Sequence, residues 1–209
     1  NPQPGAEEGY FDLFRNSLIN YKNTHQWFGK HIITMFDDHD QVGVKHKFRF
    51  CGQGDGYRHL VPALALNLTT VGIPCLYYGT EQGFNGADHR SGDDKDYSDV
   101  FLRECMFGGP FGSLQSTGRH FFNEGHEMYQ FIRSVCELRR DHLALRRGRQ
   151  YLRALSATGA DGDFHFPQLL GGKLHWIVAW SRIFADQEYL CAVNTDADHS
   201  VTAWATVDH

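Results

Sequence analysis

The sequence predicts an α/β fold followed by a small all-β domain, and three observations support this prediction. Helical segments and short apolar segments alternate in the first part of the chain, in the order typical of a parallel α/β sheet or barrel. Acidic residues follow the apolar segments. After Gly148 the pattern changes to short strand-like segments separated by turn residues, which indicates a β domain. We therefore predict domains at residues 1–148 and 149–209.

Three helices are predicted where apolar residues recur every three or four positions. The first spans residues 7–28, and Gly29 is its expected end. The second spans residues 57–70, with an inner face formed by Leu60, Ala63, Leu64, Asn67 and Leu68. The third spans residues 125–145, with an apolar face formed by Met128, Phe131, Ile132, Val135, Leu138 and His142. Gly148 ends this last pattern.

Two continuous apolar runs, residues 31–36 and 74–78, are predicted as buried parallel strands. The first run leads into Asp37-Asp38-His39-Asp40, and the second leads into Gly79-Thr80-Glu81. Active sites of parallel sheets and barrels lie at the carboxyl ends of the strands. If the two strands are neighbours, their acidic residues therefore meet at one site. The alternative is an ordinary polar turn after each strand.

Residues 84–123 have no clear period and are predicted as a long loop with at most one short helix. Five short strands are expected in the β domain, at Tyr151–Ala157, Asp163–Phe166, Leu174–Arg182, Tyr189–Asn194 and Val201–Thr206. Trp176 and Trp180 lie on one face of a predicted strand, which favours core positions. The alternative for these residues and Trp204 is an aromatic surface that binds glycans.

The composition excludes several classes of protein. The net charge is −5 without a basic stripe, which argues against nucleic-acid binding, and no apolar run is long enough to span a membrane. The five cysteines are odd in number and form no CxxC pair, so neither a disulfide framework nor a zinc site is indicated. We predict no metal and no cofactor. Cys75 and Cys136 lie within apolar patterns and are expected to be buried.

Two motifs resemble the alpha-amylase family of glycoside hydrolases. Met35-Phe36-Asp37-Asp38-His39-Asp40 is similar to the family's Phe-x-x-Asn-His-Asp motif at the end of barrel strand seven. Gly72-Ile73-Pro74-Cys75-Leu76-Tyr77-Tyr78-Gly79-Thr80-Glu81 is similar to the Gly-x-Pro-x-x-Tyr-Tyr-Gly-x-Glu motif at strand eight. Residues 137–148 resemble the family's last barrel helix, and residues 177–182 and 190–194 resemble its C-terminal β-sandwich.

This resemblance implies a retaining mechanism on α-glucosidic bonds in a (β/α)8 TIM barrel. Residues 1–148 would form the C-terminal part of the barrel, from about helix six to helix eight, and residues 149–209 a truncated β-sandwich. The family's nucleophile and acid/base carboxylates lie on strands four and five, which the resemblance places before Asn1. The N-terminus lacks an initiator Met, as expected for an internal segment. We therefore expect the chain alone to be inactive, and to pair with the missing half of the barrel or with a copy of itself.

The resemblance also assigns roles to individual residues. Asp40 matches the carboxylate that stabilises the transition state, and His39 matches a substrate-binding residue. Asp38 stands where the family usually has Asn. Two roles of Asp38 are therefore open, substrate binding and an ion pair with Lys or Arg. Tyr78, Glu81 and Arg90 are further predicted substrate contacts.

Two residue-level alternatives remain, a loop-stabilising role for Glu81 and a solvated linker around Arg90. Alternative functions are a transglycosidase of the same family, of the sucrose, trehalose or branching type, and a non-catalytic carbohydrate-binding or scaffold module. An unrelated α/β fold with chance matches to the two motifs is the remaining alternative.

Overall fold

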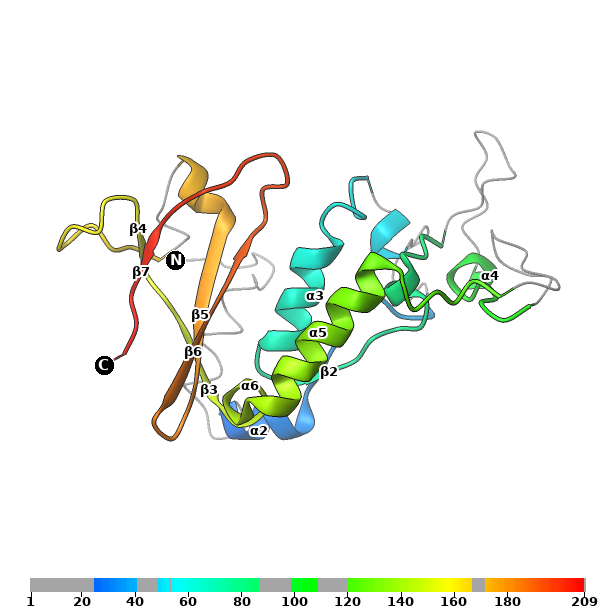
Figure 1. Cartoon of the computed structure of the whole chain (residues 1–209), viewed down its shortest axis with the longest axis horizontal. Coiled ribbons are helices and arrows are strands. Elements are labelled where there is room, and N and C mark those ends of the chain that lie inside the picture. Colours follow the sequence, from blue (N-terminus) through cyan, green and yellow to red (C-terminus); the bar gives the residue numbers. More distant parts are fainter. Residues whose placement is uncertain are drawn as a thin grey trace, which may run out of the picture. The chain divides into compact units, whose positions relative to one another are not determined.

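The structure is a computed structural model that describes residues 25–40, 49–52, 54–86, 99–108, 120–166 and 172–208. These residues form two compact units (Figure 1). The first unit contains the described segments up to Ile33, Thr69–Ile73, and those from Leu138 onward. The second contains the described parts of Thr34–Leu68 and Pro74–Glu137. The division at residue 148 predicted from the sequence stays a prediction.

The chain passes between the units within four elements, β1, α3, β2 and α5. The helices are α2 (His25–His31), α3 (Leu60–Thr69), α4 (Asp99–Leu102), α5 (Glu127–Asp141) and α6 (Leu143–Arg147), with short 3-10 helices η2 (Phe50–Gly52), η3 (Thr80–Gln82) and η5 (Gly172–Trp176). The strands are β1 (Ile33–Thr34), β2 (Ile73–Pro74), β3 (Arg149–Leu152), β4 (Leu155–Ser156), β5 (Ile177–Phe184), β6 (Gln187–Asn194) and β7 (Trp204–Ala205).

Strands β1 and β2 pair with each other, as the two strand-end motifs predict. The Ile73 amide donates to the Ile32 carbonyl at 2.8 Å, and the Cys75 amide donates to the Thr34 carbonyl at 2.8 Å. Both bonds advance by two residues in the same direction along both strands, which is the parallel pattern. The carboxyl ends of β1 and β2 therefore lie at one edge.

The prediction that these two strands are long and buried is wrong. Strand β1 contains two residues of the first run, and β2 contains only Pro74 of the second run together with Ile73 before it. His31 belongs to α2 instead. Ile33 and Met35 are 58 % and 47 % exposed, whereas Phe36 packs against the α3–α5 core. A continuous apolar run predicts a strand with other elements packed on both of its faces. Here the described residues pack on one face only. Gly29 also does not end the helix, because it keeps a negative φ and α2 continues to His31.

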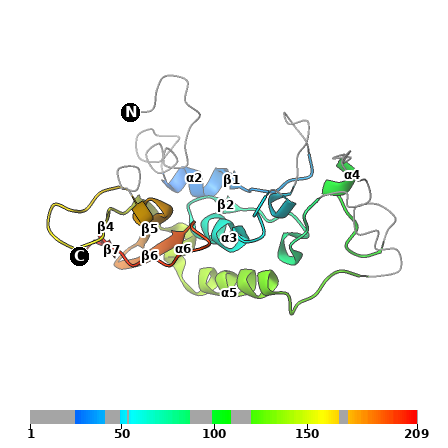
Figure 2. The same cartoon turned by 90° about the horizontal axis from the view of Figure 1, so that it is seen from above.

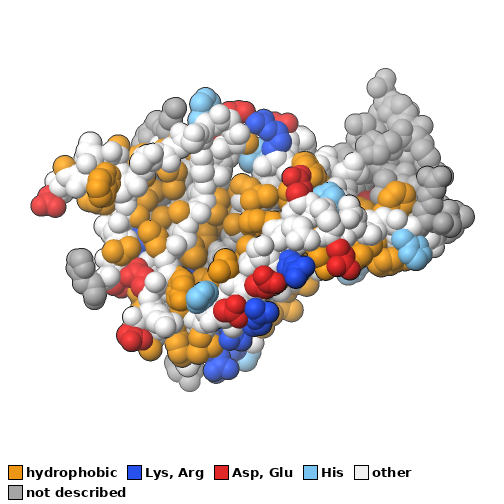
Figure 3. Space-filling view, in the orientation of Figure 1, with side chains coloured by type: hydrophobic (Ala, Val, Ile, Leu, Met, Phe, Trp, Pro, Cys, Tyr) orange, Lys and Arg blue, Asp and Glu red, His pale blue; other side chains and the backbone are white. Residues whose placement is uncertain are grey.

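Helices α3 and α5 pack side by side through a small apolar core in the second unit (Figure 2). Leu60 and Leu64 of α3 and Met128 of α5 are buried there, as the periodicity predicts. Charged side chains follow the outer face of α5 in Figure 3. Leu138 is exposed rather than part of the apolar face. The first predicted helix lies mostly outside the described residues.

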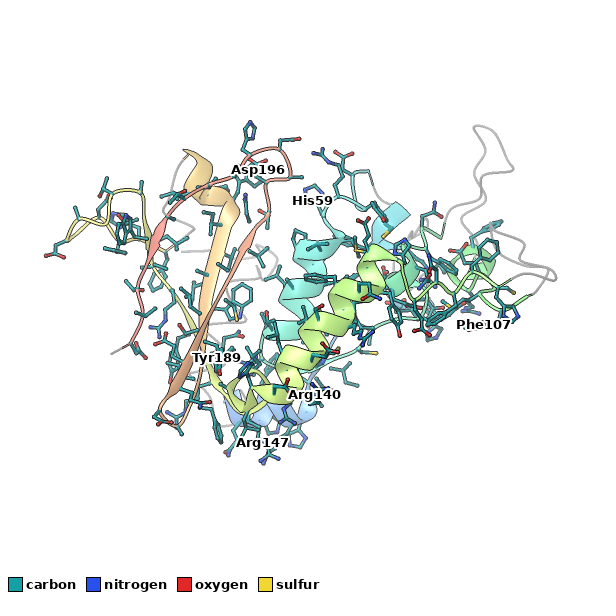
Figure 4. All side chains as sticks on the ribbon, in the orientation of Figure 1. His59, Phe107, Arg140, Arg147, Tyr189 and Asp196 are labelled. Carbon is teal, nitrogen blue, oxygen red and sulfur yellow. The ribbon has the colours of Figure 1, made fainter. Side chains whose placement is uncertain are left out.

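The third predicted helix is interrupted at His142. Its backbone is extended there, with φ −117° and ψ 105°, so that α5 ends at Asp141 and α6 begins at Leu143. The Tyr189 hydroxyl lies 2.6 Å from Nδ1 of His142 (Figure 4), which fixes this position from a distant strand. A tertiary contact of this kind is invisible to periodicity. The predicted end at Gly148 is confirmed.

The first unit contains an antiparallel sheet in the order β3-β5-β6 and a separate β4-β7 pair. The predicted strand Tyr151–Ala157 is split into β3 and β4, because the chain moves between sheets at Arg153 and Ala154. The predicted Asp163–Phe166 strand is reduced to one bridge between His165 and Leu155.

The ends of the remaining β segments also differ from the prediction. Residues 174–176 lie in η5 rather than in a strand, and Val201–Thr206 is reduced to β7. Trp180 is buried, as predicted, but Trp176 is exposed because it lies in η5 before the strand begins. Trp204 is exposed as well.

All five cysteines are free, and the predicted burial of Cys75 and Cys136 is wrong. Cys75 lies on the uncovered side of the β1–β2 pair, and Cys136 lies on the solvent side of α5. Of the predicted 84–123 loop, the described residues include α4 and an antiparallel bridge between Phe107 and His120. No helix in the described part of the chain is long and apolar enough to cross a membrane.

Candidate active site

A buried carboxylate joins the ends of the two parallel strands. Asp37 follows β1 and is only 4 % exposed. Its Oδ1 accepts the Phe50 amide at 2.6 Å, and its Oδ2 accepts the Thr80 hydroxyl at 3.2 Å. Thr80 belongs to the second motif, so this side chain holds the two strand-end motifs together. Asp37 was not among the predicted site residues.

The next three residues form a tight polar turn. Asp38 Oδ1 accepts the backbone amide of Asp40 at 2.8 Å, which is the pattern of an Asx turn. Asp38 therefore shapes the backbone that presents Asp40. Its ion pairing with Lys or Arg and its contact with substrate stay predictions.

His39 and Asp40 lie beside an arginine that sequence reasoning missed. Arg103 donates through Nε to the His39 carbonyl at 3.0 Å and through Nη2 to Asp40 Oδ1 at 3.0 Å. Asp40 Oδ2 lies 3.3 Å from Nε2 of His39. The side chains of His39, Asp40 and Arg103 are 62 %, 42 % and 44 % exposed, so this group remains open to a ligand.

A second arginine, Arg49, forms the buried base of the site. Its guanidinium carbon lies 4.4 Å from the ring centre of Tyr77, 5.0 Å from that of Tyr78 and 5.5 Å from that of Phe84. These distances are those of cation–π contacts. Its Nε and Nη2 both donate to the Leu102 carbonyl at 3.2 Å. Arg49 is 1 % exposed.

The glycine of the Tyr-Tyr-Gly motif is required by this packing. Gly79 has a φ of +87°, and a Cβ atom there would lie 2.6 Å from the Phe84 ring and 2.8 Å from Arg49 Nη1. Both the conformation and the space therefore exclude other residues. The stacked ring of Tyr77 also faces His39, with 6.5 Å between the ring centres. Burial and the neighbouring Tyr78 raise the pKa of Tyr77, so its hydroxyl stays protonated at neutral pH.

The other predicted site residues lie on the second strand end. Tyr78 is partly exposed, and its hydroxyl donates to the Glu104 carbonyl at 2.9 Å. Glu81 lies in η3, where its Oε2 accepts the Gly79 amide at 2.9 Å. This bond is of the kind that a loop-stabilising role requires, and contact of Glu81 with substrate stays a prediction. Arg90 lies outside the described residues.

The described residues contain no group of three or more His, Cys, Asp or Glu side chains that could hold a metal ion. The half-exposed groups described at this site are a carboxylate, an imidazole and a guanidinium. These groups accept and donate hydrogen bonds to hydroxyl groups such as those of a sugar.

Comparison with known proteins finds relatives with amylase-type names. A beta/alpha-amylase of Paenibacillus polymyxa is 34 % identical over 96 residues, which are 46 % of this chain and 6 % of that protein. A cyclomaltodextrin glucanotransferase of Paenibacillus macerans is 32 % identical over 117 residues, 56 % of this chain and 12 % of that protein. Alpha-amylase mde5 of Schizosaccharomyces pombe is 27 % identical over 142 residues, 68 % of this chain and 23 % of that protein.

No family model matches the chain. The curated relatives carry the names beta/alpha-amylase, cyclomaltodextrin glucanotransferase and alpha-amylase. The resemblance of this chain to the alpha-amylase family is therefore confirmed. The chain spans between 6 % and 23 % of the lengths of the three relatives described above. The (β/α)8 barrel and the truncated sandwich stay predictions.

Proposed function

We propose that this chain is the C-terminal portion of a retaining enzyme of the alpha-amylase family that acts on α-glucosidic bonds. The observation on which this rests is the His39–Asp40 pair at the carboxyl end of β1, half exposed and held by Arg103. Asp40 is the proposed transition-state stabiliser. His39, Asp38, Tyr78, Glu81 and Arg90 are the proposed substrate contacts, with a structural role as the alternative for Glu81.

The chemistry follows from the charge of the transition state. Glycoside cleavage passes through an oxocarbenium-like state, and hydrogen bonds to sugar hydroxyls that strengthen in this state lower the barrier. A carboxylate has about four acceptor positions. Arg103 occupies one on Asp40 Oδ1, and His39 lies near Oδ2, so other positions remain for sugar hydroxyls.

The nucleophile and the acid/base are proposed to come from a part of the barrel not contained in these 209 residues. Retaining enzymes need these two carboxylates about 5–5.5 Å apart. The short fraction of each relative that the chain matches supports this division. The chain alone should then show no turnover of soluble starch, maltose-type oligosaccharides or sucrose.

The test compares the 209-residue chain with a longer protein that includes the complete barrel. In the longer protein, Asp40→Asn should lower kcat by about 100- to 1,000-fold, the usual effect of losing one preorganised electrostatic group. Asp141→Asn is the matched control, because Asp141 is a similarly exposed acid paired with an arginine on α5. Activity of the chain alone at the rate of the longer protein, or an unchanged kcat of Asp40→Asn, would refute the proposal.

Transfer rather than hydrolysis is the second candidate. Relatives named cyclomaltodextrin glucanotransferase favour transfer. Relatives named amylase favour hydrolysis. The outcome depends on whether water or a second sugar attacks the glycosyl-enzyme intermediate. Product analysis of the longer protein distinguishes them, because transfer gives longer or cyclic glucans and hydrolysis gives reducing ends only.

A further inference from the structure

The loop that follows α4 has a regular alternation of buried and exposed residues. Leu102 and Glu104 are buried, whereas Arg103 between them is exposed. With Leu102 and Glu104 facing the interior, the Arg103 side chain is directed outward, toward His39 and Asp40.

Leu102 and Glu104, which flank Arg103, form hydrogen bonds with Tyr78 of the second motif or with Arg49, which stacks on that motif. Arg49 donates two hydrogen bonds to the Leu102 carbonyl at 3.2 Å, and the Tyr78 hydroxyl donates to the Glu104 carbonyl at 2.9 Å. The Glu104 carboxylate also accepts the Gly86 amide at 3.4 Å. Residue 103 is therefore held in place from both sides, and its guanidinium does not depend on a mobile loop for its position.

The guanidinium connects the turn backbone with the carboxylate. Nε of Arg103 bonds the carbonyl of His39, and Nη2 bonds Asp40 Oδ1, both at 3.0 Å. The donors of a guanidinium are fixed in one plane, so two bonds to two acceptors also fix the direction of the carboxylate. A lysine has a single charged nitrogen and cannot reproduce this bridge.

We propose that Arg103 is a positioning residue that sets the orientation of Asp40 for the reaction. This inference rests on the proposed function of Asp40. Arg103 acts through Asp40 and not on the sugar, so its loss lowers the rate of the chemical step more than it weakens the binding of substrate. A misplacement of a reacting group by about 1 Å is sufficient to cost about 100-fold in rate.

The test uses the longer protein that contains the complete barrel. Arg103→Ala should lower kcat about 10- to 100-fold while KM changes by less than about threefold. Added guanidinium at millimolar concentration should restore part of the lost kcat, and Arg103→Lys should recover less than the guanidinium does. Arg133→Ala is the control, because Arg133 forms an exposed 3.2 Å ion pair with Glu137 on α5. It should behave as wild type.

A double variant tests whether Arg103 acts on the rate through Asp40. If Arg103 acts only through this carboxylate, Arg103→Ala adds little to the loss caused by Asp40→Asn. A wild-type kcat in folded Arg103→Ala, a loss expressed only in KM, or full multiplication of the two losses would overturn the inference. If instead Asp40→Asn retains wild-type kcat, both the proposed function and this inference fail.

Discussion

Two buried charged residues, Asp37 and Arg49, determine how the exposed site residues are presented. Asp37 ties the strand ends together through Phe50 and Thr80. Arg49 stacks on aromatic rings and leaves Nη1 without a hydrogen-bond partner among the described residues. A desolvated cation–π contact contributes on the order of 2 kcal/mol, which offsets part of the cost of burying that nitrogen. The site thus has a rigid base beneath half-exposed groups.

Burial beside Asp37 suppresses the reactivity of a nearby thiol, against the opposing effect of Arg49. Burial, followed by the charge of Asp37, raises the pKa of Cys51 to about 12. Only the thiolate is nucleophilic. At pH 8 the thiolate fraction of Cys51 is therefore roughly a thousandfold lower than that of an ordinary cysteine. We expect iodoacetamide to label the exposed Cys75 and Cys136 quickly and Cys51 only after unfolding, as measured by peptide mass spectrometry.

The single substitutions Cys75→Ser, Cys136→Ser and Cys51→Ser provide the matched set for this experiment. The first two should each remove one fast-reacting thiol, and the third should remove none. Urea-unfolded protein, in which all five cysteines react, gives the reference count. Labelling of native Cys51 as fast as that of Cys75 would show that this thiol is not protected.

At the scale of elements, one arginine of β5 connects the ends of two helices. Arg182 donates to the carbonyl of Thr69, the last residue of α3, at 2.6 Å, and to that of Gly148, which follows α6, at 3.2 Å. Helix C-termini leave carbonyl groups unsatisfied and carry partial negative charge. Burial lowers the pKa of Arg182 to about 10, so it stays charged at neutral pH.

Arg182→Met should therefore be strongly destabilising. It removes the charged donor from two carbonyls, and the Thr69 carbonyl keeps the longer 3.5 Å bond from Trp180 Nε1. Each lost hydrogen bond to a charged donor costs about 1.5–3 kcal/mol. We expect a loss of about 2–5 kcal/mol in the free energy of unfolding, measured by urea denaturation. Arg149→Met is the control, because Arg149 is exposed on β3 and should change stability by less than about 0.5 kcal/mol. Equal stability of the two variants would contradict this role of Arg182.

Local sequence patterns predicted the elements whose determinants lie within a few residues. The inner face of α3 and the parallel β1–β2 pair followed from periodicity and from the two motifs. The break at His142 depends on Tyr189, which is 47 residues away, and no helical period contains this contact.

The same reason explains why the sequence patterns did not indicate Arg103 and Asp37 as site residues. Arg103 is 63 residues from Asp40, and Asp37 meets Thr80 across 43 residues. The motifs marked His39 and Asp40 because their spacing is local, whereas the residues that hold them in place come from other segments. The exposure of Ile33 and Met35 was likewise not predictable, because it depends on what covers the strand rather than on the strand itself.

At the scale of the whole molecule, this exposed face predicts association. Ile33, Met35 and Ile73 on the β1–β2 pair are exposed large apolar residues. Apolar groups in adjacent positions on a short strand pair favour contact with another protein surface, and strand edges offer unpaired backbone groups for pairing. We expect the isolated chain to self-associate, with a mass by light scattering that rises with concentration.

The substitutions Ile33→Thr and Met35→Thr test whether this face causes the association. Ile33 is the first residue of β1 and Met35 follows the strand. Each substitution removes exposed apolar surface, so the apparent mass at a given concentration should fall. Leu138→Thr is the matched control, because Leu138 is 51 % exposed but belongs to α5 and not to the strand pair. Addition of the separately produced remainder of the barrel should replace self-association with a one-to-one complex. A concentration-independent monomer of the wild-type chain would instead show that this face needs no partner.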